Sequence, residues 1–189
     1  MNSIKLEIKV RAHIKSNNVK SRRGIKMAFE QKSITGFMHR SITEENTYFF
    51  LNDFTSILVS GEDTNGAFCV LHCNGKKDGG PPLHMHELED ETFYVLEGEI
   101  TFFIGDQTIL AKAGDYVFAP RGIPHTFKVR SKDTQFIVTA YPSGFDEFVK
   151  ELSVPFHSGF QKPKGHLSTE KIEKLIKVSR KYKISYPNL

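Results

Sequence analysis

Three histidines and one glutamate stand at spacings that suit a bound metal ion. His84 and His86 are separated by one residue, Glu91 follows after four more, and His125 comes much later in the chain. Two histidines at positions i and i+2 project from the same face of an extended strand, so one strand can offer two imidazoles to one ion. Imidazole and carboxylate ligands are compatible with Fe, Mn, Ni, Co, Cu and Zn. We therefore predict a site for one divalent metal ion, whose identity stays open, with His84, His86, Glu91 and His125 as ligands.

Strand-like patterns around Glu91 and His125 indicate how these two side chains reach the histidine pair. Glu91 opens a run in which Glu91, Phe93 and Val95 share one face, and His125 opens a second run of the same kind. A hairpin return brings the carboxylate back toward the histidines, whereas His125 requires a long-range closure of the chain. We expect the four side chains to converge inside a β-barrel.

The same residues resemble the two sequence motifs of the cupins, G-x5-HxH-x3,4-E-x6-G and G-x5-PxG-x2-H-x3-N. The residues that fit are His84, His86, Glu91 and Gly98 in the first motif, and Gly114, Pro120, Gly122 and His125 in the second. Two positions depart from the motifs, since Asp78 stands at the first glycine and Val129 at the final asparagine. The spacing to Gly98 favours Glu91 over Glu89 as the carboxylate ligand.

A wider resemblance, from about Tyr48 to the C-terminus, is to the single-domain cupins similar to quercetin 2,3-dioxygenase. It implies that a flavonol-like hydroxyl loses its proton, binds the metal as an oxyanion, and that dioxygen then cleaves the substrate. It also implies that Glu91 is both a ligand and the catalytic proton acceptor, which is reasonable for a carboxylate within hydrogen-bond reach. The resemblance therefore implies a metal-dependent dioxygenase acting on an enolisable or flavonol-like aromatic small molecule.

Two other classes of protein remain open, because the cupin fold hosts many functions. One is a non-catalytic cupin that binds a metal or a small ligand, and the other is a metal-dependent isomerase of a sugar or keto acid. An isomerase pocket should carry basic side chains near the metal, for which Arg121 and His72 are the visible candidates. The apolar residues that could line a pocket, or equally form plain core, are Phe93, Val95, Phe118, Phe127, Phe136 and Tyr141.

Short β-type segments recur from Tyr48 onward, and turn residues such as Gly, Asp and Asn separate them. The expected strands span 48–51, 55–60, 67–73, 82–86, 91–97, 99–104, 107–111, 116–119, 125–130 and 134–141. No βαβ alternation accompanies them, so the pattern predicts an all-β antiparallel sandwich or barrel. The cupin resemblance narrows this prediction to a double-stranded β-helix, also called a jelly-roll barrel.

The two ends of the chain differ from this central pattern. Residues 4–14 alternate between apolar and charged side chains, which predicts an N-terminal strand. Helical spacing predicts one short helix that begins at Ser143, a plausible cap, and a second over about 169–182. We therefore expect a basic N-terminal extension over 1–32, a cupin barrel over 33–142, and a C-terminal helical segment over 143–189 that packs on the barrel.

Composition restricts the partners and the compartment. Residues 1–32 carry nine Lys or Arg against two acids, whereas residues 33–159 carry nine against eighteen. No nucleic-acid-binding signature accompanies the basic ends, and no apolar run is long enough to span a membrane. Without a secretory signal, we expect a cytoplasmic protein with no nucleic-acid or membrane partner. The apolar face of residues 4–14 needs cover, which predicts a homodimer.

The two cysteines, Cys69 and Cys73, lie four residues apart in one strand-like segment. This spacing places their Cα atoms about 13 Å apart in an extended strand, which is too far for a disulfide. We expect two buried free thiols.

Overall fold

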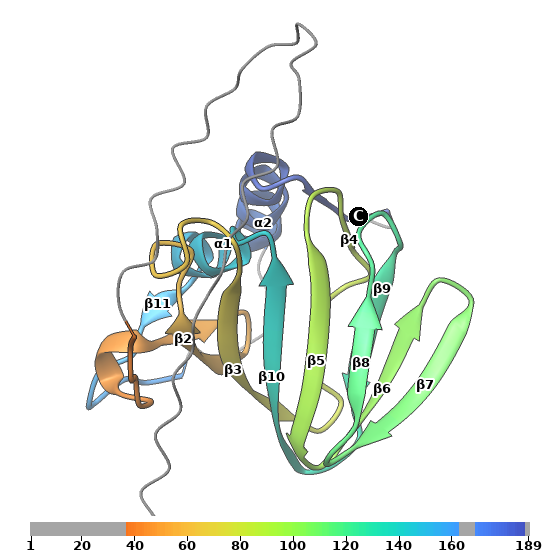
Figure 1. Cartoon of the computed structure of the whole chain (residues 1–189), viewed down its shortest axis with the longest axis horizontal. Coiled ribbons are helices and arrows are strands. Elements are labelled where there is room, and N and C mark those ends of the chain that lie inside the picture. Colours follow the sequence, from red (N-terminus) through yellow and green to blue (C-terminus); the bar gives the residue numbers. More distant parts are fainter. Residues whose placement is uncertain (1–36, 163–168, 188–189) are drawn as a thin grey trace, which may run out of the picture. The chain divides into compact units, whose positions relative to one another are not determined.

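The computed structural model describes residues 37–162 and 169–187, which fold mainly into short strands (Figure 1). The strands in the described residues are β1 (Thr47–Phe50), β2 (Asp53–Val59), β3 (Cys69–Lys76), β4 (Met85–His86), β5 (Asp90–Glu97), β6 (Glu99–Ile104), β7 (Gln107–Lys112), β8 (Tyr116–Ala119), β9 (His125–Val129), β10 (Asp133–Tyr141), β11 (Val154–Pro155) and β12 (Ile184–Ser185). The helices are the 3-10 helix η1 (Glu44–Asn46), α1 (Phe145–Leu152) and α2 (Thr169–Lys181). The expected strand over 4–14 and the extension over 1–32 lie outside the described residues.

The strands form two main antiparallel sheets (Figure 1). The larger sheet has seven strands in the order β11-β1-β2-β3-β10-β5-β8, and the smaller has three in the order β7-β6-β9. A third, two-stranded sheet pairs β12 with β4. This mostly β, antiparallel architecture confirms the predicted fold class, and the strands from β1 to β10 lie close to their predicted ranges.

Alternation along the strands places one set of side chains between the two main sheets. The main core cluster consists of Phe93, Val95, Ile100, Phe102, Ile104, Ala111, Val117, Ala119, Phe136 and Val138. Burial of each large apolar side chain stabilises the fold by about 1.5–3 kcal/mol. Phe93 and Val95 share the buried face of β5 with Glu91, as predicted. The same face therefore carries both the core and the proposed ligand.

Two residues considered as pocket lining point away from this interior. Phe118 is 54% exposed and Tyr141 is 39% exposed. The interpretation of these two side chains as pocket lining was therefore wrong. On β8 the buried positions are Val117 and Ala119, and this parity turns Phe118 to the outer face.

Two helices follow the barrel strands, as expected: α1 packs against β1 and β3 of the larger sheet, and α2 packs against α1 and β12. Phe148 of α1 joins Leu175 and Val178 of α2 and Ile184 of β12 in one buried cluster. The expected cap was wrong, because Gly144 is the N-cap residue of α1 and no side chain caps this end. Within residues 37–162 and 169–187, no helix combines the length and the apolar character that crossing a membrane demands.

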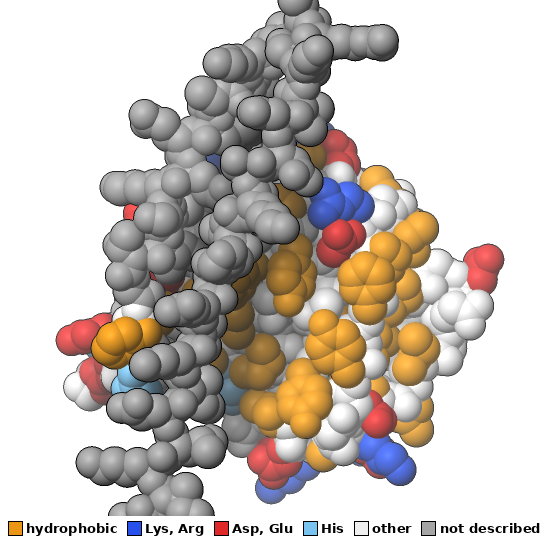
Figure 2. All heavy atoms as spheres, viewed as in Figure 1, with side chains coloured by type: hydrophobic (Ala, Val, Ile, Leu, Met, Phe, Trp, Pro, Cys, Tyr) orange, Lys and Arg blue, Asp and Glu red, His pale blue; other side chains and the backbone are white. Residues whose placement is uncertain are grey.

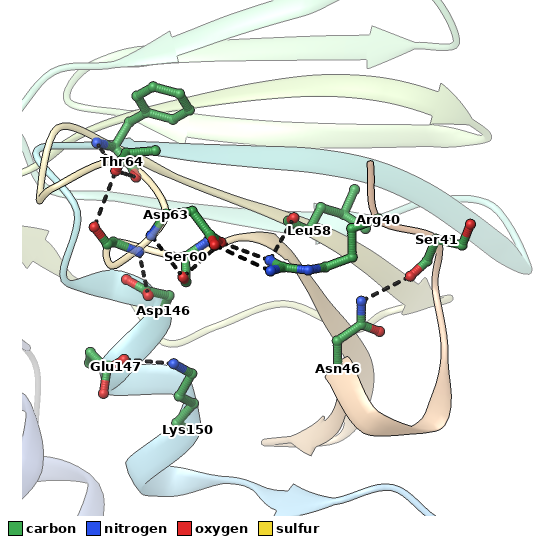
Figure 3. A network of polar contacts seen from close by, with 12 residues as sticks. Arg40, Ser41, Asn46, Leu58, Ser60, Asp63, Thr64, Asp146, Glu147 and Lys150 are labelled. Atoms are coloured by element: carbon green, nitrogen blue, oxygen red, sulfur yellow. Dashed lines mark hydrogen bonds and ion pairs between the residues drawn. The ribbon is translucent and has the colours of Figure 1, made fainter. Parts of the chain in front are cut away.

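A polar network anchors the start of α1 to the loop after β2 (Figure 3). The carboxylate of Asp146, which has 0% exposure, accepts hydrogen bonds from the backbone N–H of Gly61 at 2.8 Å and of Gly144 at 3.2 Å. Asp63, in the same loop, accepts a hydrogen bond from Arg40 at 2.8 Å, and this guanidinium holds the pKa of the Asp63 carboxyl well below its usual range. Of these two carboxylates, only that of Asp146 belongs to α1, so its hydrogen bond to Gly61 is the one that joins the helix to the loop.

We expect Asp146→Asn to destabilise the fold by about 1–3 kcal/mol, because the new amide NH2 would face a buried backbone N–H and leave it without an acceptor. The free energy of unfolding from urea denaturation measures this loss. A matched control is Glu147→Gln on the same helix, where the exposed ion pair with Lys150 should contribute less than about 1 kcal/mol. Equal stability of the two variants would contradict the assigned role of Asp146.

Candidate metal centre

Both main sheets and the short strand β4 deliver side chains to one buried point. One ligand atom from each of His84, His86, Glu91 and His125 lies within 4.8 Å of the others, and all four residues are buried. Glu91 stands on β5 of the larger sheet, and His125 on β9 of the smaller one. Backbone hydrogen bonds in both directions join His84 to His125, at 3.0 Å and 2.8 Å. The structure thus brings together all four residues that the sequence singled out.

The carboxylate of Glu91 lies at the centre of this group. Its Oε2 atom is 2.9 Å from Nε2 of His125, 3.4 Å from Nε2 of His86 and 4.0 Å from Nε2 of His84. All three imidazoles therefore present the same ring nitrogen to one carboxylate oxygen.

The opposite ring nitrogen of each histidine is held by a hydrogen-bond acceptor. Nδ1 of His84 lies 3.0 Å from the carbonyl oxygen of Pro82, and Nδ1 of His125 lies 3.0 Å from that of Ile123. A carbonyl oxygen only accepts, so each of these Nδ1 atoms carries a proton. Nε2 of the neutral His84 ring therefore keeps a free lone pair, whereas Nε2 of His125 is hydrogen-bonded to Oε2 of Glu91 at 2.9 Å. Nε2 of His86 is buried with no hydrogen-bond partner in the described residues. Such lone pairs suit coordination of a metal.

The electrostatics of the group follow from burial and mutual proximity. Burial and the nearby His125 lower the pKa of His84 to about 3. Burial alone would raise the pKa of Glu91, but the neighbouring His86 and His125 outweigh it and hold this pKa at about 2. At neutral pH an ionised carboxylate therefore faces a neutral imidazole. Lone pairs repel a carboxylate oxygen at such distances, and a cation between them removes this repulsion.

Glu89 supports the centre from outside the four residues. It is 4% exposed, and its Oε2 atom lies 2.8 Å from Nδ1 of His86. Burial opposes the charged form of His86, but Glu91 and the hydrogen bond to Glu89 outweigh it and raise the pKa of this imidazole. A carboxylate behind a histidine fixes the orientation of the ring and increases its basicity toward a metal. The sequence favoured Glu91 as the ligand, and it did not assign this supporting role to Glu89.

Gly144 makes room for this supporting carboxylate. Its backbone has a φ of 146°, and a Cβ atom there would lie 2.7 Å from Oε1 of Glu89. A residue with a side chain would therefore displace Glu89 from His86. The start of α1 thus has a direct spatial link to the candidate metal centre.

The position where Asp78 replaces the motif glycine is a tight turn. Asp78 has a φ of 65°, in the left-handed region that favours glycine but also tolerates aspartate. Its carboxylate pairs with Lys128 at 2.9 Å. The departure from the motif therefore affects a turn and leaves the four candidate ligands in place.

The two basic candidates for isomerase chemistry point elsewhere. Arg121 donates to Asp90 at 2.7 Å and to the carbonyl oxygen of Tyr141 at 3.1 Å, at an exposed rim. His72 lies 3.1 Å from Gln135 through its Nε2 atom, on the face of β3 opposite to Leu71 and Cys73. Neither residue is among those that line the cavity at the centre.

A cavity of about 260 Å³ opens beside the candidate ligands. Its lining includes His84, His86 and Glu91 at one end, and the aromatic residues Phe50, Phe93, Phe127, Phe136, Phe145, Phe148 and Tyr186. Phe93, Phe127 and Phe136 were predicted, whereas Val95 belongs to the core and is not part of the lining. The volume is close to the lower bound of roughly 300 Å³ for small-molecule sites, so the cavity suits a small ligand.

The C-terminal segment builds one wall of this cavity. β12 pairs with β4 so that Ile184 lies opposite His86 and Ser185 opposite Met85. The next residue, Tyr186, places its ring centroid 6.2 Å from that of His84. Sequence reasoning missed this wall, because β12 has only two residues and carries no periodic pattern.

The two cysteines are free thiols, as expected. Burial raises the pKa of both Cys69 and Cys73 to about 12. Neither thiol is therefore ionised at neutral pH, although Cys73 lines the cavity.

Comparison with known proteins agrees with this architecture. The model of the cupin domain matches residues 72–140, a range that contains all four candidate ligands. An RmlC-like cupin from Shewanella frigidimarina NCIMB 400 superposes with a TM-score of 0.50 at 20% identity, over 59% of this chain and 96% of that one. This likeness shows a mostly β cupin fold with antiparallel sheets. In this chain two helices, α1 and α2, follow the barrel strands.

Two characterised enzymes resemble the chain in sequence. Quercetin 2,3-dioxygenase from Bacillus subtilis (strain 168) is 31% identical over 100 residues, which are 53% of this chain and 30% of the relative. Quercetin 2,3-dioxygenase from Aspergillus japonicus is 28% identical over 96 residues, covering 47% of this chain and 27% of the relative. The matched region therefore spans less than a third of the length of either enzyme.

Proposed function

Because residues 72–140 form a cupin domain that gathers three histidines and a glutamate at one buried point, we propose that this protein is a metal-dependent dioxygenase that cleaves an enolisable or flavonol-like aromatic substrate. The observation that carries the proposal is the common orientation of three imidazole Nε2 atoms toward Oε2 of Glu91, with each Nδ1 held by an acceptor. The distant similarity to two quercetin 2,3-dioxygenases supports the choice of reaction.

His84, His86, Glu91 and His125 would hold one divalent ion, chosen from Fe, Mn, Ni, Co, Cu or Zn. Such an ion supplies Lewis-acid stabilisation of an oxyanion and, if it is redox-capable, reactivity with dioxygen. The chain itself contributes fixed ligand geometry through Pro82, Glu89 and Ile123, which orient the imidazoles from behind.

The lining of the cavity favours a neutral aromatic substrate over a sugar acid or a keto acid. Its described residues include seven aromatic side chains and no Lys or Arg that could pair with a substrate carboxylate. For this reason we rank the dioxygenase above the isomerase.

Glu91 is placed to move a proton as well as to coordinate. Its carboxylate lines the cavity, so it lies within reach of a substrate hydroxyl that enters toward the histidines. Its low pKa keeps this carboxylate ionised at neutral pH, so both oxygens can accept a hydrogen bond from the substrate hydroxyl. In the proposal, Glu91 takes the proton of the enolic or phenolic hydroxyl.

We expect the double variant His84→Ala with His125→Ala to lose stoichiometric metal, because half of the ligand set is removed. Elemental analysis of protein purified without added metal measures the content, and circular dichroism checks that the variant remains a folded β protein. The matched control His157→Ala replaces an exposed histidine outside the site and should keep the metal of the wild type. Unchanged metal in the double variant would overturn the assignment.

We expect Glu91→Gln to retain part of the metal but to lose turnover by about 100-fold or more, since an amide oxygen still coordinates but cannot accept the proton. Oxygen uptake with a flavonol, measured per bound metal, tests this expectation. Turnover equal to that of the wild type would exclude Glu91 as the base.

Failure of the dioxygenase proposal as a whole gives a different result from failure of the role of Glu91 alone. If no flavonol, diketone or catechol drives oxygen uptake by the wild type with any of the metals named, the dioxygenase assignment is wrong. A metal-loaded protein without such activity would instead be a binding cupin, or an isomerase if it interconverts sugars or keto acids.

We also propose that the protein forms a homodimer. β8 is an edge strand of the larger sheet, and hydrophobic side chains gather on the outer face of β5 and β8 (Figure 2). Tyr116 is 62% exposed and Phe118 54% exposed on this face. An unpaired edge with an apolar face is suited to pairing with a second copy.

The double variant Tyr116→Lys with Phe118→Lys should shift the protein from dimer to monomer, because two charges would be buried in the interface. Light scattering at micromolar concentration measures the mass. Ile109→Lys with Leu110→Lys, two exposed positions on β7 of the other sheet, is the matched control and should leave the dimer intact. A wild type that scatters as a monomer would exclude the dimer, and deletion of residues 1–15 should also weaken association.

A further inference from the structure

The cavity has a second polar end, remote from the candidate ligands. We propose that Asp53 binds a neutral hydrogen-bond donor, a phenolic hydroxyl, at the end of the substrate opposite to the oxygen that faces Glu91. The inference rests on the proposed function for the identity of the substrate class, but the binding role of Asp53 can be tested without turnover.

Strand parity directs Asp53 into the cavity. On β2, Asp53 and Thr55 alternate with Phe54, and both Asp53 and Thr55 line the cavity. Phe54 faces the other way, where its ring packs 5.2 Å from that of Phe156. The first residue of β2 therefore presents its carboxylate to the same space as Glu91.

Cys73 stands on β3, which lies between the strands that carry the two carboxylates, and it pairs with Thr55 of β2, two residues after Asp53. The charges of both Glu91 and Asp53 contribute to the raised pKa of this thiol, although burial is the main cause. The Cys73 side chain also lines the cavity. Through β10, Glu91 is in register with Cys69 at the start of β3, whereas Asp53 lies beyond Cys73 toward the end of β3, so the register separates these two acidic groups of the lining.

The side chain of Asp53 has no hydrogen bond and no ion pair with any residue in the described parts of the chain, and the residue is half-buried. Neighbouring polar groups at this end are already engaged: Asp78 pairs with Lys128 at 2.9 Å, and the Asn74 amide donates to the carbonyl oxygen of Phe54 at 3.3 Å. A partly desolvated carboxyl without a partner favours a ligand that donates a hydrogen bond to it.

A neutral donor fits this position better than an ammonium group. Burial raises the pKa of Asp53, and the charges of Lys162 and Lys76 oppose that effect. Positive charge therefore already lies near the carboxyl, so an added cation gains less from Asp53 than it would from a carboxylate without such neighbours. A hydroxyl donates one hydrogen bond without adding charge.

The apolar walls of the cavity favour an aromatic ring system in the substrate. Apart from the two acidic groups, these walls include Phe93, Phe127, Phe136 and Val138. Aromatic side chains stack favourably on aromatic rings. The structure therefore favours a flat aromatic molecule with an acidic hydroxyl at one end and a second hydroxyl at the other.

The test compares two flavonol probes that differ by one distal hydroxyl, 3-hydroxyflavone and 3,4′-dihydroxyflavone, in metal-loaded protein without oxygen. The wild type should bind the dihydroxy probe about tenfold more tightly in fluorescence titrations, as expected for one hydrogen bond to a carboxyl. Asp53→Leu should remove this preference and leave the affinity for 3-hydroxyflavone within about twofold of the wild type, the spread expected without a lost hydrogen bond. Asp53→Asn, which retains an acceptor oxygen, should keep part of the preference.

Asp78→Asn is the matched control, because Asp78 lies at the same end of the cavity but is paired with Lys128. It should keep the full preference for the dihydroxy probe. An Asp53→Leu variant that is folded by circular dichroism and still prefers this probe as the wild type does would overturn the role of Asp53, as would a wild type that binds both probes equally.

A second pair of probes separates this inference from the proposed function. 4-Phenylphenol and biphenyl lack a metal-binding group, so calorimetry with chelator-treated protein measures the contribution of the hydroxyl alone. If flavonols fail to bind but 4-phenylphenol binds more tightly than biphenyl in an Asp53-dependent manner, the dioxygenase proposal fails and the role of Asp53 stands. Equal binding of these two probes, or no binding of either, would overturn that role.

Discussion

The contact of one carboxylate oxygen with three imidazole nitrogens is the constraint on which the rest of the structure depends. Glu91 approaches from the larger sheet and His125 from the smaller one, while His84 and His86 enter from the segment between β3 and β5. An isolated bridge between the backbones of His84 and His125 ties the histidine segment to β9 of the smaller sheet. The core can close around the group only if the two sheets face one another here.

Much of the fold and of the site followed from local patterns in the sequence. The i, i+2 spacing of the histidines and the alternation of Glu91, Phe93 and Val95 are properties of single strands, which short-range rules describe well. The supporting role of Glu89 depends on a rotamer and on the missing side chain of Gly144, which lies far along the chain. Such a pair is not visible in the sequence, because the contact is long-range and leaves no periodic signal.

The two wrong predictions of pocket lining also arose because contacts between distant strands leave no signal in the sequence. Phe118 and Tyr141 were considered as pocket lining because they are aromatic and lie near the motifs, but the parity of β8 and β10 turns them outward. Asp53 carried no motif, and its position became evident only when β2 was found beside β3 in the larger sheet. Residue type suggests what a side chain can do, whereas strand pairing decides which side chains meet.

Because β12 pairs with β4, the candidate metal ligands and one wall of the cavity come from different parts of the chain. The candidate ligands lie within residues 72–140, whereas Tyr186 and Ile184 come from a short strand that follows α2. Exchange of this terminal segment between related proteins would remodel the cavity wall next to His84 and leave the ligand set unchanged. In this architecture, the shape of the cavity next to His84 can change by recombination or drift in the segment after α2, where the main sheets place few demands on the sequence.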